Sequence, residues 1–404
     1  RAFKITSNSW EYTGDGQTLA YDAGADLLDM EFVQFHPTGM VWPPSVRGIL
    51  VTEGVRGEGG ILTNSEGKRF MFEDVPPLYR SSTADNEEEG WRYVTGDKDA
   101  NRPPELLTRD HVARKIVKEV KAGRGSEHGG AYLDIAWIKE KFKDSETHIK
   151  KKLPSMYHQF KELAGVDITK EKMEVGPTTH YAMGGIRVDS ETQMTTVEGL
   201  FACGECAAGL HGANRLGGNS LSDLLVFGKR AGAHAAKFAA EIDTFSAIDS
   251  KEVDTLVTQA LAPVDRTEGE NPYKIQQDLQ ETMQDLAGIS RSEAGLNEAI
   301  ERIRGYAKRA ENAHAPGNRQ YNPGWHTALD LHNLLTVSEA MCLSAEQRTE
   351  SRGGHFREEY PEKSKEGSTY NTVVRKAQDG SMEVERVPVV PQTEEMKQII
   401  EANE

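Results

Sequence analysis

Residues 211–221 (HGANRLGGNSL) constrain the fold more than any other part of the sequence. They join a glycine-rich turn and one arginine, Arg215, to the polar start of a long apolar helix. The glycines let the backbone come close to a flat ligand because they carry no side chain. Asn219 and Ser220 are common helix N-cap types, and the N–H groups at such a helix start suit a site where negative charge develops. The segment predicts a ligand site beside Arg215, whose guanidinium can hold a carboxylate, although a purely structural helix cap would explain the same residues.

The length and charge of the chain limit the classes of function. A chain of 404 residues is long enough for two or three domains. The formal net charge of −16 argues against a nucleic-acid-binding surface, so we expect no nucleic acid among the partners. No apolar run approaches the length of a membrane span, and no signal peptide is evident. We expect a chain that does not cross a membrane itself but can dock on a partner that does.

Three cysteines, Cys203, Cys206 and Cys342, are too few for a disulfide framework and are typical of a reducing compartment. The spacing of Cys203 and Cys206 also permits a redox or zinc site. Zinc requires a second ligand pair, however, and none stands at a suitable spacing. The simpler interpretation is a pair of small buried residues where a strand ends in a turn, so we expect no metal site in this chain.

Local patterns predict a mixture of short strands and long helices. Arg109 follows a pair of prolines and opens a helix. Beyond about residue 250, apolar residues recur at helical spacing, and Ser290 begins a sequence typical of a capping box. A further helix is expected over about 325–345, and two strands within the last 50 residues. The antiparallel helices should pack as a bundle.

Five further motifs occur in order along the chain: residues 36–39 (HPTG), 52–60 (TEGVRGEGG), 109–110 (RD), 180–185 (HYAMGG) and 204–205 (GE). Together with the glycine-rich segment described first, they resemble the signature of the succinate dehydrogenase and fumarate reductase flavoproteins. L-aspartate oxidase is a close relative of these proteins. The resemblance extends over nearly the whole chain.

The resemblance implies an α/β plus α+β fold with four domains. Part of a Rossmann-like FAD-binding domain is expected at residues 1–35 and 179–242, and an inserted capping domain at 36–178. A helical bundle domain would follow at 243–345, and a small C-terminal domain at 346–404. No GxGxxG fingerprint follows a strand near the start. The expectation is therefore that an amino-terminal part of the same subunit carries the rest of the FAD site and any histidine that attaches FAD covalently.

In the family that the sequence resembles, two sets of residues bind the two carboxylates of succinate or fumarate. The match places His180 and Arg215 on one carboxylate, and His36 and Thr52 on the other. Arginine offers a bidentate fork, while histidine and threonine add directed donors. Without the resemblance, each histidine would more simply be a structural residue.

The resemblance assigns proton transfer to Arg109, with Glu53 and Arg56 on the path from solvent. An arginine acid conflicts with the usual arginine pKa, which lies above about 12. The conflict eases if Arg109 gains one proton as it loses another. The alternative is an ordinary exposed arginine at a helix start.

Five positions match flavin-binding residues of the family: Asp15, Glu205, Asn219, Ser220 and Leu221. Carboxylates can accept hydrogen bonds from ribityl or ribose hydroxyls. The helix start at Ser220 and Leu221 would face the edge of the flavin ring where reduction places negative charge. The implied cofactor is FAD.

The implied activity is that of an FAD-dependent succinate dehydrogenase, the succinate:quinone oxidoreductase or respiratory complex II of the tricarboxylic acid cycle. It interconverts succinate and fumarate by hydride transfer with FAD. Because the chain has no cysteine set for a cluster, electrons would pass to a separate iron–sulfur subunit, with membrane anchor subunits and quinone beyond it. The expected location is peripheral, on the cytoplasmic face of a bacterial inner membrane or the matrix face in mitochondria.

Three alternatives stay open at this point. Fumarate reductase uses the same residues in the opposite direction. L-aspartate oxidase shares most of the carboxylate-binding residues and usually differs from the dehydrogenases at Met183, Gly217 and Gly218. A non-catalytic assembly module is the third alternative.

Overall fold

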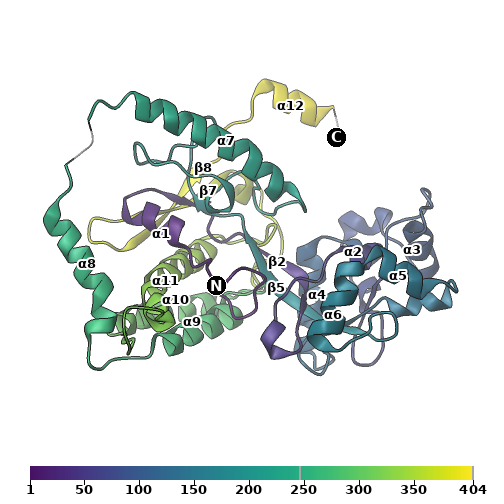
Figure 1. Ribbon diagram of the computed structural model, residues 1–404. Coiled ribbons are helices and arrows are strands. Elements are labelled where there is room, and N and C mark those ends of the chain that lie inside the picture. Colours follow the sequence, from purple (N-terminus) through teal and green to yellow (C-terminus); the bar gives the residue numbers. More distant parts are fainter. Residues whose placement is uncertain (245–246, 403–404) are drawn as a thin grey trace. The chain divides into compact units, whose positions relative to one another are not determined.

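The computed structural model describes residues 1–244 and 247–402, which fall into two compact units (Figure 1). Unit 1 comprises Arg1–Thr13, Val33–Tyr181 and Gln277–Ser290. Unit 2 comprises Gly14–Phe32, Ala182–Gln276 and Arg291–Glu404. The chain therefore passes between the units several times, and each unit is built from segments far apart in the sequence.

Unit 1 contains a four-stranded sheet in the order β2-β5-β4-β3. Its strands are β2 (Val33–Met40), β5 (Met173–Ala182), β4 (Ala131–Asp134) and β3 (Ile61–Thr63). Its α-helices are α2 (Gly54–Gly57), α3 (Glu87–Val94), α4 (Arg109–Lys121), α5 (Ser145–Lys152) and α6 (Pro154–Ala164). All eight residues of β2 are buried, and α4 packs against this strand. On α4, Val112 and Ile116 lie four residues apart on one face and are fully buried in the core.

Unit 2 contains a second four-stranded sheet in the order β6-β1-β7-β8. Its strands are β6 (Gly185–Ile186), β1 (Leu27–Leu28), β7 (Tyr370–Lys376) and β8 (Met382–Pro388). Its helices are α1 (Asp15–Asp22), α7 (Asn219–Ala240), α8 (Ser250–Asp265), α10 (Glu293–Ala310), α11 (Pro323–Gln347) and α12 (Glu394–Glu401). A further helix, α9 (Pro272–Leu286), begins in unit 2 and ends in unit 1.

The centre of unit 2 is α11, which packs against α1, α10 and β7. Val337 of α11 lies so close to Gly14 that a Cβ on this glycine would be 2.7 Å from a Val337 methyl carbon. Gly14 also has a φ of 90°, a conformation that glycine adopts without strain. The start of α1 is thus fixed by a residue with no side chain.

The structure confirms the long elements that the sequence predicts and corrects their caps. α4 begins at Arg109, and the two expected strands near the end are β7 and β8. The prediction that Asn219 and Ser220 cap their helix is wrong, because the N-cap of α7 is Gly218 (φ 85°) and no side chain caps this end. The predicted capping box at Ser290 is also wrong, since Ser292 caps α10 by accepting from the Gly295 N–H.

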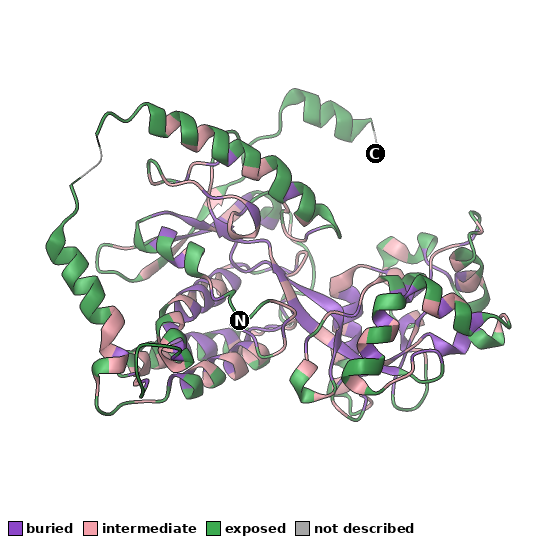
Figure 2. Cartoon of the chain, in the orientation of Figure 1, coloured by how far each residue is buried: buried purple, intermediate pink, exposed green. Residues whose placement is uncertain are grey.

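Helices α7 and α8 have little core of their own (Figure 2). Of the 22 residues of α7, only Asp223 and Ala231 are buried, although the helix is largely apolar. Leu221 and Leu225 are 68% and 77% exposed. An exposed apolar surface of this kind is typical of a site that binds another molecule or chain segment.

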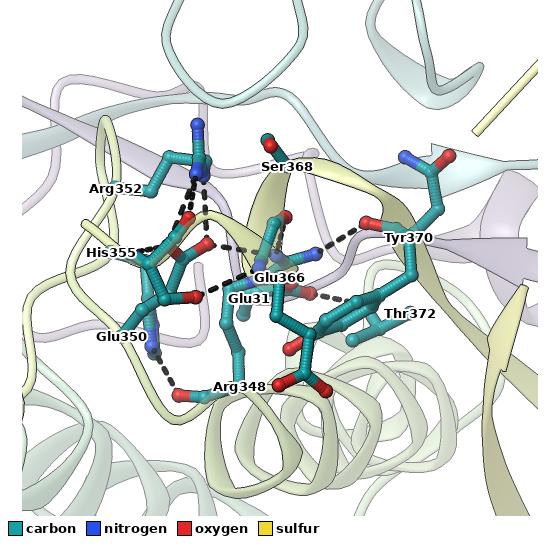
Figure 3. A network of polar contacts seen from close by, with 12 residues as sticks. Glu31, Arg348, Glu350, Arg352, His355, Glu366, Ser368, Tyr370 and Thr372 are labelled. Carbon is teal, nitrogen blue, oxygen red and sulfur yellow. Dashed lines mark hydrogen bonds and ion pairs between the residues drawn. The ribbon is translucent and has the colours of Figure 1, made fainter. Parts of the chain in front are cut away.

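A buried network around Arg348 joins three separate parts of unit 2 (Figure 3). The Arg348 guanidinium donates from Nε to Glu31 Oε1 at 2.5 Å and from Nη1 to Glu350 Oε1 at 3.2 Å. Its Nη2 lies 3.5 Å from Asp29 Oδ1. Glu31 also accepts from the Thr372 hydroxyl at 2.6 Å. One arginine thus compensates the charge of carboxylates from two distant segments in a region that excludes water.

We predict that Arg348→Met destabilises the protein by about 3–5 kcal/mol, because it leaves the buried Glu31 carboxylate without its ion-pair partner, whereas Glu350 keeps its ion pair with Arg352. Arg386→Met is the matched control. The guanidinium groups of Arg348 and Arg386 lie 4.8 and 4.7 Å from the Tyr370 ring, but Arg348 is buried whereas the Arg386 side chain is 38% exposed. The control substitution should lower the free energy of unfolding by only about 0–1 kcal/mol. Urea unfolding of the purified protein measures both values, and equally small losses would contradict the prediction.

Candidate active site

Strand β2 presents two polar side chains on one face in the interior of unit 1. Gln34 and His36 are two residues apart and therefore point to the same side of the strand. Their exposed fractions are 2% and 1%. Buried polar side chains require hydrogen-bond partners. Gln34 accepts from Arg109, and His36 contacts the backbone of Thr38.

The rings of His36 and His180 face each other from neighbouring strands, β2 and β5. Their centroids are 5.4 Å apart and their planes make an angle of 68°. Burial, followed by the positive charges of Arg56 and Arg109, holds the pKa of His36 well below its usual value. His36 is therefore neutral near pH 7, and its Nδ1 lies 3.0 Å from the carbonyl oxygen and 3.3 Å from the nitrogen of Thr38. The ring tautomer decides which of these contacts is a hydrogen bond.

Arg109 is held from two directions at the start of α4. Its Nε donates to Glu53 Oε2 at 3.2 Å, and its Nη1 donates to Gln34 Oε1 at 3.3 Å. Glu53 in turn lies 3.7 Å from Nη2 of Arg56. The three residues to which the resemblance assigns proton transfer therefore lie together in unit 1: Arg109 is hydrogen-bonded to Glu53, and Glu53 is ion-paired with Arg56.

Arg56 is the innermost member of this chain. It is fully buried in α2, and its Nη1 donates to the carbonyl oxygen of Glu105. Burial lowers its pKa to about 10. A guanidinium with a lowered pKa gives up a proton more readily than one in water.

Thr52 lies immediately before this chain and is half-buried. Its hydroxyl accepts from the Gly54 N–H at 3.3 Å. The contact fixes the hydroxyl at the start of α2, next to Glu53. The predicted substrate and proton-transfer residues of unit 1 thus come from β2, β5, α2, α4 and the segment before α2.

In unit 2, Arg215 lies beside the start of α7. It is 6% exposed, and its Nη1 donates to the Ser220 hydroxyl at 3.3 Å. His211 and Asp223 form a second pair, with Nε2 and Oδ2 3.5 Å apart. The glycine-rich segment therefore folds back onto the first turns of α7. That Arg215 and His180 bind one carboxylate stays a prediction.

The start of α7 fits the edge of a flat ligand that becomes anionic. Gly218 has no side chain, and no side chain caps the first turn of this 22-residue helix. The first-turn N–H groups and the positive end of the helix dipole suit negative charge, and the exposed side chain of Leu221 offers apolar surface next to them. These residues fit the flavin ring that the sequence predicts.

The two predicted acidic flavin ligands have partners within unit 2. Glu205 accepts from the Ala182 N–H at 3.0 Å, and burial raises its pKa. Asp15 is exposed at the first turn of α1 and accepts from Asn333 Nδ2 at 2.8 Å. That these carboxylates bind FAD stays a prediction.

The sequence reasoning missed three residues of these clusters. Gln34 stands two residues before His36, so strand alternation could have found it. Asp223 stands in the second turn of an apolar helix, where a charged residue is a signal of a buried pair. Ser7, whose hydroxyl oxygen lies 2.9 Å from His180 Nδ1, gives no signal in the sequence.

The cysteine pair and the membrane question can be examined in the part of the chain that the structure describes. Cys206 Sγ lies 3.3 Å from the carbonyl oxygen of Cys203, and burial raises the pKa of Cys206. No group of three or more His, Cys, Asp or Glu side chains in the described residues could hold a metal ion. None of the described helices combines the length and the apolar character needed to cross a bilayer.

Two family models match the chain. Residues 1–221 match an FAD binding domain, and residues 276–400 match the C-terminal region of the fumarate reductase flavoprotein. The first match alone covers more than half of the 404 residues.

Curated relatives of the chain are named fumarate reductase or succinate dehydrogenase. The chain is 42% identical over 363 residues to a component of the fumarate reductase (CoM/CoB) of Methanothermobacter marburgensis, covering 89% of this chain and 59% of that protein. It is 36% identical over 376 residues to a succinate dehydrogenase flavoprotein subunit of Coxiella burnetii, covering 90% of this chain and 58% of that protein. The chain thus spans a little under three fifths of the length of these relatives.

Solved structures agree with these matches. The chain superposes on the Mycobacterium smegmatis Sdh1 structure in complex with UQ1 with a TM-score of 0.81 and 49% identity, covering all of this chain and 62% of that one. For a quinol-fumarate reductase with menaquinol molecules, the TM-score is 0.82 and the identity 33%, covering 97% of this chain and 65% of that one. The motifs, the mixed α/β fold and these comparisons lead to one conclusion: the chain belongs to the FAD-binding family of succinate dehydrogenase and fumarate reductase flavoproteins.

Proposed function

We propose that the protein is the flavoprotein subunit of a succinate dehydrogenase and interconverts succinate and fumarate. The observation that carries this proposal is the chain Arg109–Glu53–Arg56 in unit 1, next to the facing rings of His36 and His180. A proton path and a cationic binding surface are the two things that this chemistry demands of the protein. The family membership supports the same reaction.

The dicarboxylate is bound at its two ends. His36 and Thr52 hold one carboxylate, and His180 and Arg215 hold the other. Arg215 supplies full positive charge and a planar fork, while the imidazole and hydroxyl groups supply single directed hydrogen bonds. Binding at both ends fixes the two central carbons relative to the proton donor, and orientation of this kind can contribute on the order of 7–11 kcal/mol at the limit.

Arg109 transfers the proton at one central carbon. In fumarate reduction it gives a proton to that carbon and recovers one that Glu53, 3.2 Å away, relays from solvent. In succinate oxidation the same proton moves in the opposite direction. Because Arg109 gains one proton as it loses another, its side chain never has to persist as a neutral guanidine. Gln34 holds the other edge of the guanidinium and keeps its direction fixed.

The flavin site belongs to unit 2. FAD, when bound, supplies the group that accepts or donates the hydride at the other central carbon. The backbone N–H groups at Asn219, Ser220 and Leu221 would stabilise negative charge on the bound ring, and Asp15 and Glu205 would accept hydrogen bonds from the hydroxyls of FAD. Arg215 is tied to the same helix start through Ser220.

Electrons leave the flavoprotein through partners. The direct acceptor that we propose is an iron–sulfur subunit, with membrane anchor subunits and quinone beyond it. The protein is then peripheral, on the cytoplasmic face of a bacterial inner membrane or the matrix face of a mitochondrial one. The supporting relatives include both dehydrogenases and reductases, so fumarate reductase is the alternative physiological direction.

We predict that the purified complete protein contains flavin, that succinate bleaches its absorbance and that fumarate restores it. Both changes should be blocked by malonate, a dicarboxylate that cannot react. The measurement is anaerobic absorbance spectroscopy near the flavin maximum. Bleaching by L-aspartate but not succinate would instead identify an L-aspartate oxidase, and a colourless protein would identify a non-catalytic module.

We predict that Arg109→Gln abolishes flavin oxidation by fumarate while malonate still binds, because glutamine can donate a hydrogen bond but cannot carry a proton onward. Glu53→Gln should slow the reaction with a smaller effect on binding. Arg114→Gln is the control, since Arg114 lies on the same helix but forms its ion pair with Asp110 at 3.0 Å. Single-turnover kinetics and malonate titration separate rate from affinity. Equal losses of both in Arg109→Gln would make Arg109 a carboxylate ligand instead.

We predict that His180→Ala and Arg215→Lys weaken dicarboxylate binding by about 1.5–3 kcal/mol or more, because each removes a charge-assisted hydrogen bond. Bound flavin should be retained in both variants. His158→Ala is the control, because His158 is an exposed residue of α6. Succinate steady-state kinetics and flavin content are measured together, and wild-type kinetics in either variant would remove that residue from the site.

A further inference from the structure

A short segment near the start of the chain runs beside the end of β5. The Thr179 N–H donates to the Ile5 carbonyl oxygen at 3.0 Å, and the Ser7 N–H donates to the Thr179 carbonyl oxygen at 2.9 Å. Thr6 and Thr179 form a parallel bridge. This pairing fixes the position of Ser7 next to His180, and all of these residues belong to unit 1.

The Ser7 hydroxyl contacts the imidazole of His180 directly. Ser7 Oγ lies 2.9 Å from His180 Nδ1 and 3.3 Å from the Thr179 carbonyl oxygen. A hydroxyl has one proton to donate and can also accept. If Ser7 donates to Nδ1, the shorter contact, a neutral His180 carries its proton on Nε2. If Ser7 donates to Thr179, it accepts from Nδ1 and leaves Nε2 without a proton.

We propose that Ser7 is a positioning residue that selects the Nε2–H form of His180. A carboxylate only accepts hydrogen bonds, so only this neutral form of the ring can bind one through Nε2. The inference rests on the proposed function, because it gives Ser7 a role in presenting His180 to a dicarboxylate. Ser7 itself acts through the histidine.

The neighbours of Ser7 hold this arrangement in place. Thr6, which is 6% exposed, donates from its hydroxyl to Asn8 Oδ1 at 2.6 Å. Asn8 Nδ2 in turn lies 3.5 Å from the His180 carbonyl oxygen. Side chains on both sides of Ser7 therefore fix the backbone at that residue, and its hydroxyl is directed at a ring whose own backbone is also held.

His180 belongs to a cluster that also contains His36, Arg56 and Arg109. His36 faces His180 from the neighbouring strand β2, and burial together with Arg56 and Arg109 lowers the pKa of His36, so that His36 is uncharged at neutral pH. The same two arginines add positive charge to the cluster. A neutral imidazole has two tautomers, and a neighbouring hydroxyl decides between them.

This role predicts a specific dependence on pH. A doubly protonated imidazole carries N–H groups on both nitrogens, so the choice between tautomers no longer matters once the ring is charged. The binding defect caused by losing Ser7 should therefore be largest at high pH and shrink as the pH falls. A residue that only supports the fold would produce a defect of similar size across the range.

The test compares Ser7→Ala, Ser7→Thr and Ser9→Ala in the flavin-loaded complete protein. Ser9 is exposed, and its hydroxyl accepts from the nearby Glu11 N–H at 3.4 Å. Malonate dissociation constants are measured by calorimetry between about pH 6 and pH 8.5, values that bracket the usual histidine pKa of about 6.5. The dissociation constant of each variant is divided by that of wild type at the same pH. Because malonate itself titrates equally in both measurements, its titration cancels in this ratio.

We expect Ser7→Ala to bind malonate about 5- to 10-fold more weakly than wild type at the highest pH, the loss typical of one hydrogen bond. The ratio should approach one at the lowest pH, and Ser7→Thr and Ser9→Ala should match wild type throughout. A ratio that is constant with pH, or equal to one everywhere, would overturn the role of Ser7. If wild-type protein bound no malonate at all, the proposed function would fail instead, so the two failures are distinguishable.

Discussion

The ion network around Arg348 is the interaction on which unit 2 depends. Arg348 and Glu31 are 317 positions apart in the sequence, yet their side chains meet at 2.5 Å with almost no exposure to water. A buried carboxylate without a cation is strongly unfavourable, so the end of α11 and the segment after β1 are stable only together. The same guanidinium lies over the rings of Phe32 and Tyr370, which exclude water from the ion pairs. The network therefore makes the folding of distant segments interdependent.

Much of the candidate site could be predicted from the sequence because its residues stand in ordered local motifs. Arg109 was expected to open a helix, and it does so in contact with Glu53. Glu53 and Arg56 are three residues apart, so a single turn of α2 brings them together. When two functional residues lie on one helical turn, their spacing in the sequence predicts that their side chains meet.

The remaining contacts could not be predicted because they join residues far apart in the chain. Ser7 and His180 are separated by 173 positions, and no local pattern marks their pairing. The predicted cap at Asn219 failed for a different reason. A left-handed glycine at the preceding position already turns the chain into α7, so the helix start is left to backbone N–H groups rather than to a side chain. The N-cap preferences of Asn and Ser do not reveal whether a side chain caps the first-turn N–H groups or leaves them open.

The weak burial of α7 has a consequence for the behaviour of the protein in solution. Copies that expose an apolar helix attract one another, whereas the formal charge of −16 keeps them apart at low ionic strength. Added salt shortens the range of that repulsion to about 8 Å at physiological strength and leaves the apolar attraction in place. The net charge therefore opposes association of copies through α7, and this opposition weakens as the ionic strength rises.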